Sequence, residues 1–265
     1  MTRYPAKRGI FLCHRAMIWL YRTVFCRGGY GVHSPFAFDL ITNVIEEKRP
    51  FYCYEMLDNM RLQLRRESRC LRCGDRELTA KQALRRLCFS AQGYRLLFRL
   101  ANRFHPGKIL AVGSGMGLTP LSVTACSTDA GCVVFEPEPS VAVIARNLIK
   151  KYARSSIGVH VGMPGEPEPP DLNRFDFIVW GTSGAERGAG FAADFSPEAF
   201  EKLLRYAADE SVMIISGING SRAAKKTWKG ICAHPGVSVT MDLYSLGIVF
   251  FSPKLNRKTY KCIPL

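Results

Sequence analysis

The sequence lacks the long apolar runs that would mark a membrane-spanning protein. No uninterrupted apolar run reaches the roughly 20 residues that a spanning helix needs. The apolar and basic segment Ile10–Phe25 is interrupted by a histidine and two arginines, and no small-residue cleavage site follows it, so a secretory signal is not expected. We therefore expect a protein without a transmembrane segment that works in the cytoplasm.

The ten cysteines lack the spacing of a metal-binding framework. Only Cys70 and Cys73 form a C-x-x-C arrangement, and no second pair follows that could complete a four-thiolate zinc site. Cys126, Cys132 and Cys232 stand among apolar residues, where a free cysteine packs as a small hydrophobe. We expect reduced thiols, with a metal or redox role for the C-x-x-C pair as the alternative.

Acidic residues are scarce in the first part of the chain. Residues 1–108 hold 21 Lys and Arg against 8 Asp and Glu, whereas residues 109–265 hold 16 against 14. A basic half of this kind indicates an anionic partner, either nucleic acid or an acidic membrane surface. The alternative is an ordinary solvated surface, because the arginines between Arg61 and Arg76 form no recognised nucleic-acid-binding motif.

Apolar residues at helical spacing dominate the first 107 residues. Ile10–Phe25 fits an amphipathic helix with a basic face. Ser34 and Pro35 form a typical N-cap and first-turn pair for the next helix. One long helix or two shorter ones are expected from Leu78 to Ala101. We interpret residues 1–107 as a basic α-helical extension.

From residue 108 the pattern changes to alternating strands and helices. Five apolar runs separated by helical segments predict parallel strands, and two closing runs joined by a three-residue turn predict an antiparallel hairpin. The expected strands are Lys108–Val112, Cys132–Phe135, Gly158–Val161, Phe175–Trp180, Ser211–Ile215, Val237–Leu243 and Gly247–Phe251. Residues 108–265 are thus expected to form an α/β domain around a seven-stranded sheet.

The segment ILAVGSGMG (Ile109–Gly117) breaks from a buried strand into a glycine-rich loop. Its glycines allow a ligand to approach the backbone closely, and the N-terminus of the following helix adds N–H donors. A dinucleotide-binding loop needs G-x-G-x-x-G, but Leu118 occupies the last glycine position. The spacing is G-x-G-x-G instead, and Glu136 follows Gly113 by 23 residues.

This loop resembles the cofactor loop of class I S-adenosylmethionine-dependent methyltransferases. The segments GYGVHSPFAFDLITNVIEEK (Gly29–Lys48) and HPGVSVTMDLYSLGIVFF (His234–Phe251) are similar to Bacteroidetes methyltransferase-like proteins with an N-terminal helical extension. The catalytic half of those proteins looks like the catechol-type O-methyltransferases. The resemblance implies a Rossmann-like seven-stranded methyltransferase sheet, S-adenosyl-L-methionine as cofactor and an unknown methyl acceptor.

The resemblance also implies which residues bind the cofactor. Glu136 would bind the ribose hydroxyls, and Met163 lies where the family places residues near the adenine. Trp180 would face the crevice in which open α/β sheets bind ligands. The alternatives are a tight strand-helix turn for the loop residues, a solvated acid for Glu136 and core packing for Met163 and Trp180. The complete expected set is Gly113, Ser114, Gly115, Gly117, Glu136, Met163 and Trp180.

The carboxylates used by metal-dependent relatives are missing. Trp180-Gly181 stands where the relatives carry an Asp-Gly step, and Ser216-Gly217 stands where they carry paired aspartates. Mg²⁺ prefers charged oxygen ligands, and Asn219 is only a neutral substitute. We therefore expect no metal site and no metal-dependent mechanism.

No catalytic residue can be assigned from the sequence. His33 precedes a predicted N-cap, His160 lies within a predicted strand and is expected to be buried, and His234 stands at a helix end. Methyl transfer depends mainly on positioning, because the sulfonium is already activated. An active methyltransferase is the leading interpretation. A catalytically inactive methyltransferase fold serving as a binding or scaffold protein, and a nucleic-acid-binding protein using the basic half, are the alternatives.

Overall fold

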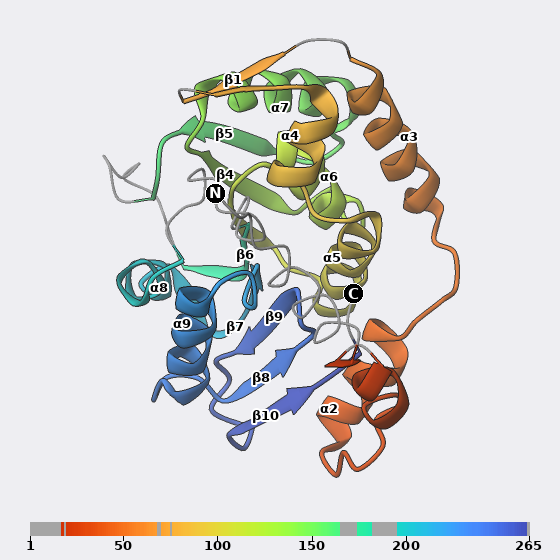
Figure 1. The fold of residues 1–265 in the computed structure, drawn as a ribbon, viewed down its shortest axis with the longest axis vertical. Coiled ribbons are helices and arrows are strands. Elements are labelled where there is room, and N and C mark those ends of the chain that lie inside the picture. Colours follow the sequence, from red (N-terminus) through yellow and green to blue (C-terminus); the bar gives the residue numbers. More distant parts are fainter. Residues whose placement is uncertain are drawn as a thin grey trace, which may run out of the picture.

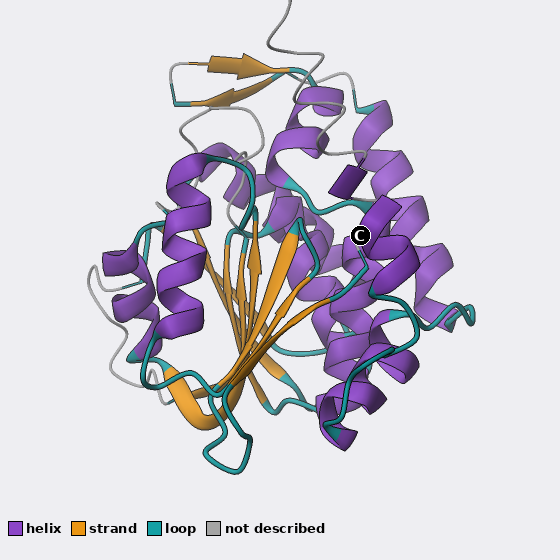
Figure 2. Ribbon diagram, turned by 60° about the horizontal axis from the view of Figure 1, so that its bottom comes forward, coloured by secondary structure: helices purple, strands orange, loops and turns teal. Residues whose placement is uncertain are grey.

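A computed structural model describes residues 17–18, 20–67, 70–74, 76–164, 174–181 and 195–263 of the chain. Its centre is a twisted sheet with helices on both faces (Figure 1, Figure 2). The strands are β3 Lys108–Val112, β4 Gly131–Glu136, β5 Ile157–Val161, β6 Phe175–Trp180, β7 Ala207–Ser216, β8 Val239–Asp242, β9 Leu246–Phe250 and β10 Lys258–Lys261. Their order across the sheet is β10-β8-β9-β7-β6-β3-β4-β5.

The sheet is parallel except for the two pairs that β9 forms. This strand is antiparallel to β7 and to β8, whereas β10 pairs with β8 in parallel. The prediction of five parallel strands followed by an antiparallel hairpin is confirmed. Strand β10 was not predicted, because Tyr260 is its one buried residue and a single buried position makes no apolar run.

The helices form a layer on each face of the sheet (Figure 2). Those of the N-terminal half, with α6 and α7, pack on one face, and α8 and α9 pack on the other. Residues 20–25 are also helical. The remaining bounds are α2 Pro35–Leu40, the π-helix η1 Ile41–Ile45, α3 Tyr52–Arg66, α4 Ala80–Leu87, α5 Ala91–Phe104, the 3₁₀-helix η2 Gly115–Gly117, α6 Leu118–Thr124, α7 Pro139–Tyr152, α8 Pro197–Leu204 and α9 Arg222–Ala233.

Successive residues of the central strand supply the two cores. Ile109 and Ala111 of β3 belong to the core shared with α5, α6 and α7, whereas Leu110 and Val112 belong to the core shared with α8 and α9. This alternation is the period of two of a strand. Because helices cover both faces, the strand is apolar from Ile109 to Val112, and this continuous run makes it easy to predict from the sequence.

The helices of the N-terminal half share a core with the sheet. Leu97 of α5 and Ile109 of β3 belong to the same buried cluster. The boundary between residues 107 and 108 is therefore a change of secondary structure along the chain, and a division into two domains stays a prediction. The half is not wholly helical, because Leu71–Cys73 (β1) and Arg76–Leu78 (β2) form an antiparallel hairpin.

The predicted helix starts are largely confirmed. The Ser34 hydroxyl accepts a hydrogen bond from the Ala37 N–H at 3.3 Å, as an N-cap does. The helical stretch expected from Leu78 to Ala101 consists of two helices, α4 and α5. Ser90 caps the second of them. In the described part of the chain, no helix combines the length and the apolar character needed to cross a bilayer.

Arg99 of α5 is a buried cation that stabilises the N-terminal half. Its guanidinium donates to the carbonyls of Val44 and Ile45 at 2.6 and 3.1 Å and to the Tyr54 hydroxyl at 3.0 Å. Both carbonyls lie in the last turn of η1, where the helix itself supplies no donors. Part of the basic excess of this half is thus structural.

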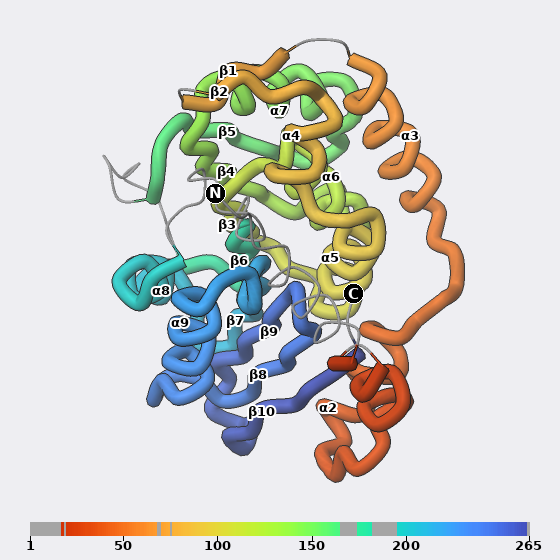
Figure 3. Tube along the Cα trace, viewed as in Figure 1, coloured from red at the N-terminus to blue at the C-terminus, as the bar shows by residue number. Residues whose placement is uncertain are grey.

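Arg22 fixes the first described helix beside the edge of the sheet that β10 forms (Figure 3). Its Nη1 donates to the Asp242 carboxylate and to the Asp242 carbonyl, both at 2.8 Å. Arg22 is 6% exposed, so the ion pair is largely shielded from water. This contact joins two residues that lie 220 positions apart in the sequence.

Arg99→Met should lower the free energy of unfolding by about 3 kcal/mol, because the carbonyls of Val44 and Ile45 would stay buried without donors. Arg103→Met, one turn further along α5, removes only an exposed pair with Asp39 and should cost less than about 1 kcal/mol. Urea unfolding followed by circular dichroism measures both losses. Equal small losses would show that Arg99 does not stabilise the fold.

Candidate cofactor site

The glycine loop connects the carboxyl end of β3 to α6. Four of its five residues have a left-handed backbone, with φ of +87° at Gly113, +55° at Gly115, +60° at Met116 and +95° at Gly117. Met116 is the one residue of these four that carries a side chain. A left-handed backbone costs such a residue about 1 kcal/mol or more. Its side chain is almost fully buried, so packing holds the strained turn in place.

Neighbouring groups leave no room for side chains at two of the glycines. A Cβ at Gly113 would lie 2.8 Å from the Gly181 carbonyl oxygen, just beyond β6. A Cβ at Gly115 would overlap the hydroxyl oxygen of Tyr94. Packing within the protein therefore requires glycine here, in addition to any close approach of a ligand.

Tyr94 and Cys88 lie directly beneath the loop and were not anticipated from the sequence. The Cys88 Sγ donates to the Gly115 carbonyl at 3.2 Å, and the Tyr94 hydroxyl accepts from the Phe89 N–H at 3.3 Å. Burial raises the pKa of Cys88 to about 12 and raises that of Tyr94 well above its ordinary value. Both groups are neutral near pH 7, so their role is to support the loop.

Glu136 ends β4 and is joined directly to the loop. One oxygen of its carboxylate accepts from the backbone N–H of Ser114 at 2.8 Å and from the Ser114 hydroxyl at 2.5 Å. The other oxygen accepts from the Glu138 N–H at 3.2 Å. A carboxylate can accept about four hydrogen bonds, so capacity remains for a ligand that donates.

The environment of Glu136 makes its ionisation unfavourable. The residue is 6% exposed, and this burial raises the pKa of its carboxyl. The hydrogen bonds from Ser114 lower this pKa, but the increase caused by desolvation is larger. A carboxyl with a perturbed pKa beside a glycine loop is typical of a functional site.

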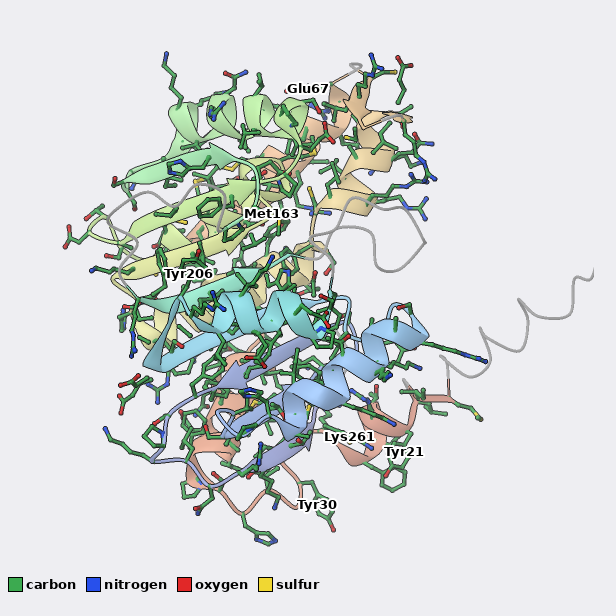
Figure 4. All side chains as sticks on the ribbon, turned by 90° about the vertical axis from the view of Figure 1, so that its left-hand side faces the viewer. Tyr21, Tyr30, Glu67, Met163, Tyr206 and Lys261 are labelled. Atoms are coloured by element: carbon green, nitrogen blue, oxygen red, sulfur yellow. The ribbon has the colours of Figure 1, made fainter. Side chains whose placement is uncertain are left out.

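Met163 and Trp180 lie on the face of the sheet that α8 and α9 cover. Met163, labelled in Figure 4, is half-buried and packs against that core. Trp180 is completely buried and meets the Phe195 ring edge-on, with 5.2 Å between ring centroids. Both side chains thus belong to this core, and a contact with a cofactor stays a prediction for them.

The end of β7 carries no acidic side chain. The Gly217 N–H donates to the Ser245 carbonyl at 2.7 Å, and the Asn219 side chain donates to the Tyr244 carbonyl at 2.8 Å. These bonds fix the turn between β8 and β9. Across the residues that the structure describes, no three His, Cys, Asp or Glu side chains gather closely enough to hold a metal ion. Within the C-x-x-C pair, Cys70 is exposed whereas Cys73 is buried.

Two of the described histidines, His160 and His234, contact neighbouring residues. His160 is exposed and not buried as predicted, because β5 is an edge strand, and its ring stacks on Phe135. The Nε2 of His234 lies 3.2 Å from a carboxylate oxygen of Glu201, and its Nδ1 accepts from the Gly236 N–H. His33 is exposed beside the cap of α2.

Neither a protein-family model nor a curated protein matches the sequence. Solved structures match its fold. The O-methyltransferase TomG from Streptomyces achromogenes, in complex with SAM, is 17% identical with a TM-score of 0.50 and covers 63% of this chain and 82% of its own. Cofactor-bound Rv0187 from MTB is 17% identical with a TM-score of 0.54, and the match covers 74% of this chain and 89% of Rv0187.

A third match is a putative caffeoyl-CoA O-methyltransferase from Staphylococcus aureus. It is 15% identical with a TM-score of 0.50 and covers 76% of this chain and 93% of its own. The chain has the Rossmann-like methyltransferase fold. At these identities the likeness concerns the fold alone.

Gly115→Ala should destabilise the protein by about 2 to 3 kcal/mol, because the new methyl group would overlap the Tyr94 hydroxyl in a left-handed turn. Tyr94→Phe removes that hydroxyl at a cost of about 1 kcal/mol. The double variant should therefore lose less than the sum of the two single losses. Urea unfolding of the four proteins measures this coupling, and additive losses would contradict the contact.

Proposed function

We propose that the chain binds S-adenosyl-L-methionine over the glycine loop and transfers its methyl group to an acceptor. The observation that carries the proposal is the placement of Glu136, whose buried carboxylate lies against Ser114 at the carboxyl ends of two adjacent parallel strands. Ligands of open α/β sheets bind at this edge. The methyltransferase fold supports the same ligand, since neighbours are described as bound to SAM or to a cofactor.

The residues present suit this cofactor. The loop backbone from Gly113 to Gly117 would lie against the ligand, and the unused acceptor capacity of Glu136 would take the ribose hydroxyls. Met163, two residues beyond β5, would contact the adenine. When bound, the cofactor supplies an activated methyl group, and the protein must orient the acceptor and exclude water.

We further propose that transfer proceeds without a divalent metal. Mg²⁺ sites need several oxygen ligands, usually with carboxylate charge, and Trp180, Ser216 and Gly217 stand at the positions where metal-dependent relatives carry aspartates. The acceptor would then be a group that is nucleophilic without metal activation. A protein that binds the cofactor but does not turn it over is the second candidate, favoured by the same lack of carboxylates.

Glu136→Gln should weaken binding of S-adenosylhomocysteine by roughly ten- to a hundred-fold, because hydrogen bonds to a charged acceptor are worth about 1.5 to 3 kcal/mol. The matched control is Glu138→Gln, whose carboxylate accepts from the Gly74 N–H at 2.9 Å and is not joined to the loop. Titration calorimetry compares both variants with the unaltered chain.

The control variant should bind like the unaltered chain. Absence of binding to the unaltered chain at millimolar ligand, or an equal loss in both variants, would contradict the proposed site. Transfer of a labelled methyl group from the cofactor into a lysate fraction then separates an active enzyme from the second candidate.

Affinity for S-adenosylhomocysteine should decrease as the pH is lowered from neutral. The ribose hydroxyls donate to the ionised carboxylate, and burial raises the pKa of Glu136, so protonation begins at a higher pH than for an ordinary glutamate. Calorimetry over a pH series should show this dependence in the unaltered chain and lose it in Glu136→Gln. The same pH slope in both proteins would assign the effect to another group.

The free energy of unfolding of the unliganded protein should decrease as the pH rises, whereas the affinity for S-adenosylhomocysteine should increase. The folded state binds the Glu136 proton more tightly than the unfolded chain does, so ionisation lowers the free energy of unfolding as the pH rises through the raised pKa. Urea unfolding at each pH, relative to Glu136→Gln, provides this check.

A further inference from the structure

The helix at residues 20–25 and the residues just before it expose a row of large apolar side chains. A spacing of three, one, three and one residues places these side chains on one face of a helix. Their exposed fractions lie between 58% and 66%, far above those of a core-facing helix. We call this row the apolar stripe: Met17, Leu20, Tyr21, Val24 and Phe25.

The opposite face of the same helix is fixed to the protein. Arg22 is 6% exposed and pairs with Asp242, and its Nη1 also lies 3.5 Å from the carbonyl of Cys262. The buried ion pair sets the rotation of the helix, so the apolar stripe points outward. Contiguous apolar patches of this kind mark interaction surfaces.

Exposed basic and aromatic residues lie on the same side of the molecule as the apolar stripe. Lys261 is exposed and precedes Cys262, and Figure 4 shows Tyr21, Tyr30 and Lys261 on the same side of the molecule. Tyr30 is 86% exposed. Arg27, two residues beyond the helix, is also exposed, and no Asp or Glu occurs among residues 17–38. The face therefore combines exposed apolar side chains with positive charge.

We propose that the apolar stripe docks on the surface of an anionic lipid bilayer. An amphipathic helix that carries Leu and Phe on one face within a basic segment binds the headgroup region by inserting its apolar side chains. Anionic headgroups attract neighbouring basic residues such as Lys261 and Arg27. A second copy of the chain is disfavoured, because two basic faces would repel.

Nucleic acid is also a weaker match for this face. Three of the five stripe side chains, Met17, Leu20 and Val24, offer neither hydrogen bonds nor stacking to bases, whereas the acyl region of a bilayer accepts all five. The proposal concerns a surface distinct from the glycine loop, so its failure would leave the cofactor proposal untouched.

The test is co-sedimentation of the full chain with vesicles of phosphatidylcholine, with or without about one third phosphatidylglycerol. The stripe variant is Leu20→Gln with Phe25→Gln. The matched control is Leu62→Gln with Val143→Gln, which alters two apolar residues exposed on other helices. Because all four side chains are exposed, both variants should fold, and thermal unfolding followed by circular dichroism checks this.

We expect binding to the anionic vesicles that is weakened by roughly ten-fold or more in the stripe variant and unchanged in the control. Raising NaCl from about 0.1 M to about 0.5 M should also weaken binding. The proposal is overturned if the unaltered chain does not sediment with anionic vesicles, or if both variants bind equally. Stripe-dependent dimers in analytical ultracentrifugation, or stripe-dependent binding to a single-stranded RNA without vesicle binding, would likewise overturn it.

Discussion

The bond between Glu136 and Ser114 is the contact on which the candidate site depends. Parallel pairing places Val112 beside Phe135, so the residues just beyond each strand meet at the same edge of the sheet. The carboxylate takes both donors of Ser114 and thereby fixes the start of the loop. The left-handed turn begins one residue later at Gly115, whose carbonyl contacts the Tyr94 hydroxyl.

The position of this carboxylate is costly for the protein. Burial disfavours its charge, and its hydrogen bonds to Ser114 and Glu138 only partly offset the desolvation, so its pKa is raised. A core residue of similar size would avoid this cost. A buried charge that is only partly compensated is typical of ligand sites, where a bound ligand supplies the missing hydrogen-bond donors.

Much of the sheet could be predicted from the sequence, because strands covered on both faces are continuous apolar runs. The two predicted strands Lys108–Val112 and Phe175–Trp180 agree with β3 and β6 residue for residue. The edge strand β10 could not be found, since it buries one side chain. The basic half is evident from the sequence, but the burial of Arg22 and Arg99 is not. The hydrogen-bond partners of Arg22 lie 220 residues away along the chain, and those of Arg99 lie about 50 residues away. The support of the loop by Tyr94 is hidden for the same reason.

A crystal structure of the chain with S-adenosylhomocysteine would test the placement of the cofactor directly. We expect density for the ligand over the loop from Gly113 to Gly117, with the ribose hydroxyls within hydrogen-bond distance of the Glu136 carboxylate. A ligand bound elsewhere, or a Glu136 carboxylate that still contacts only protein donors beside a bound ligand, would contradict this placement.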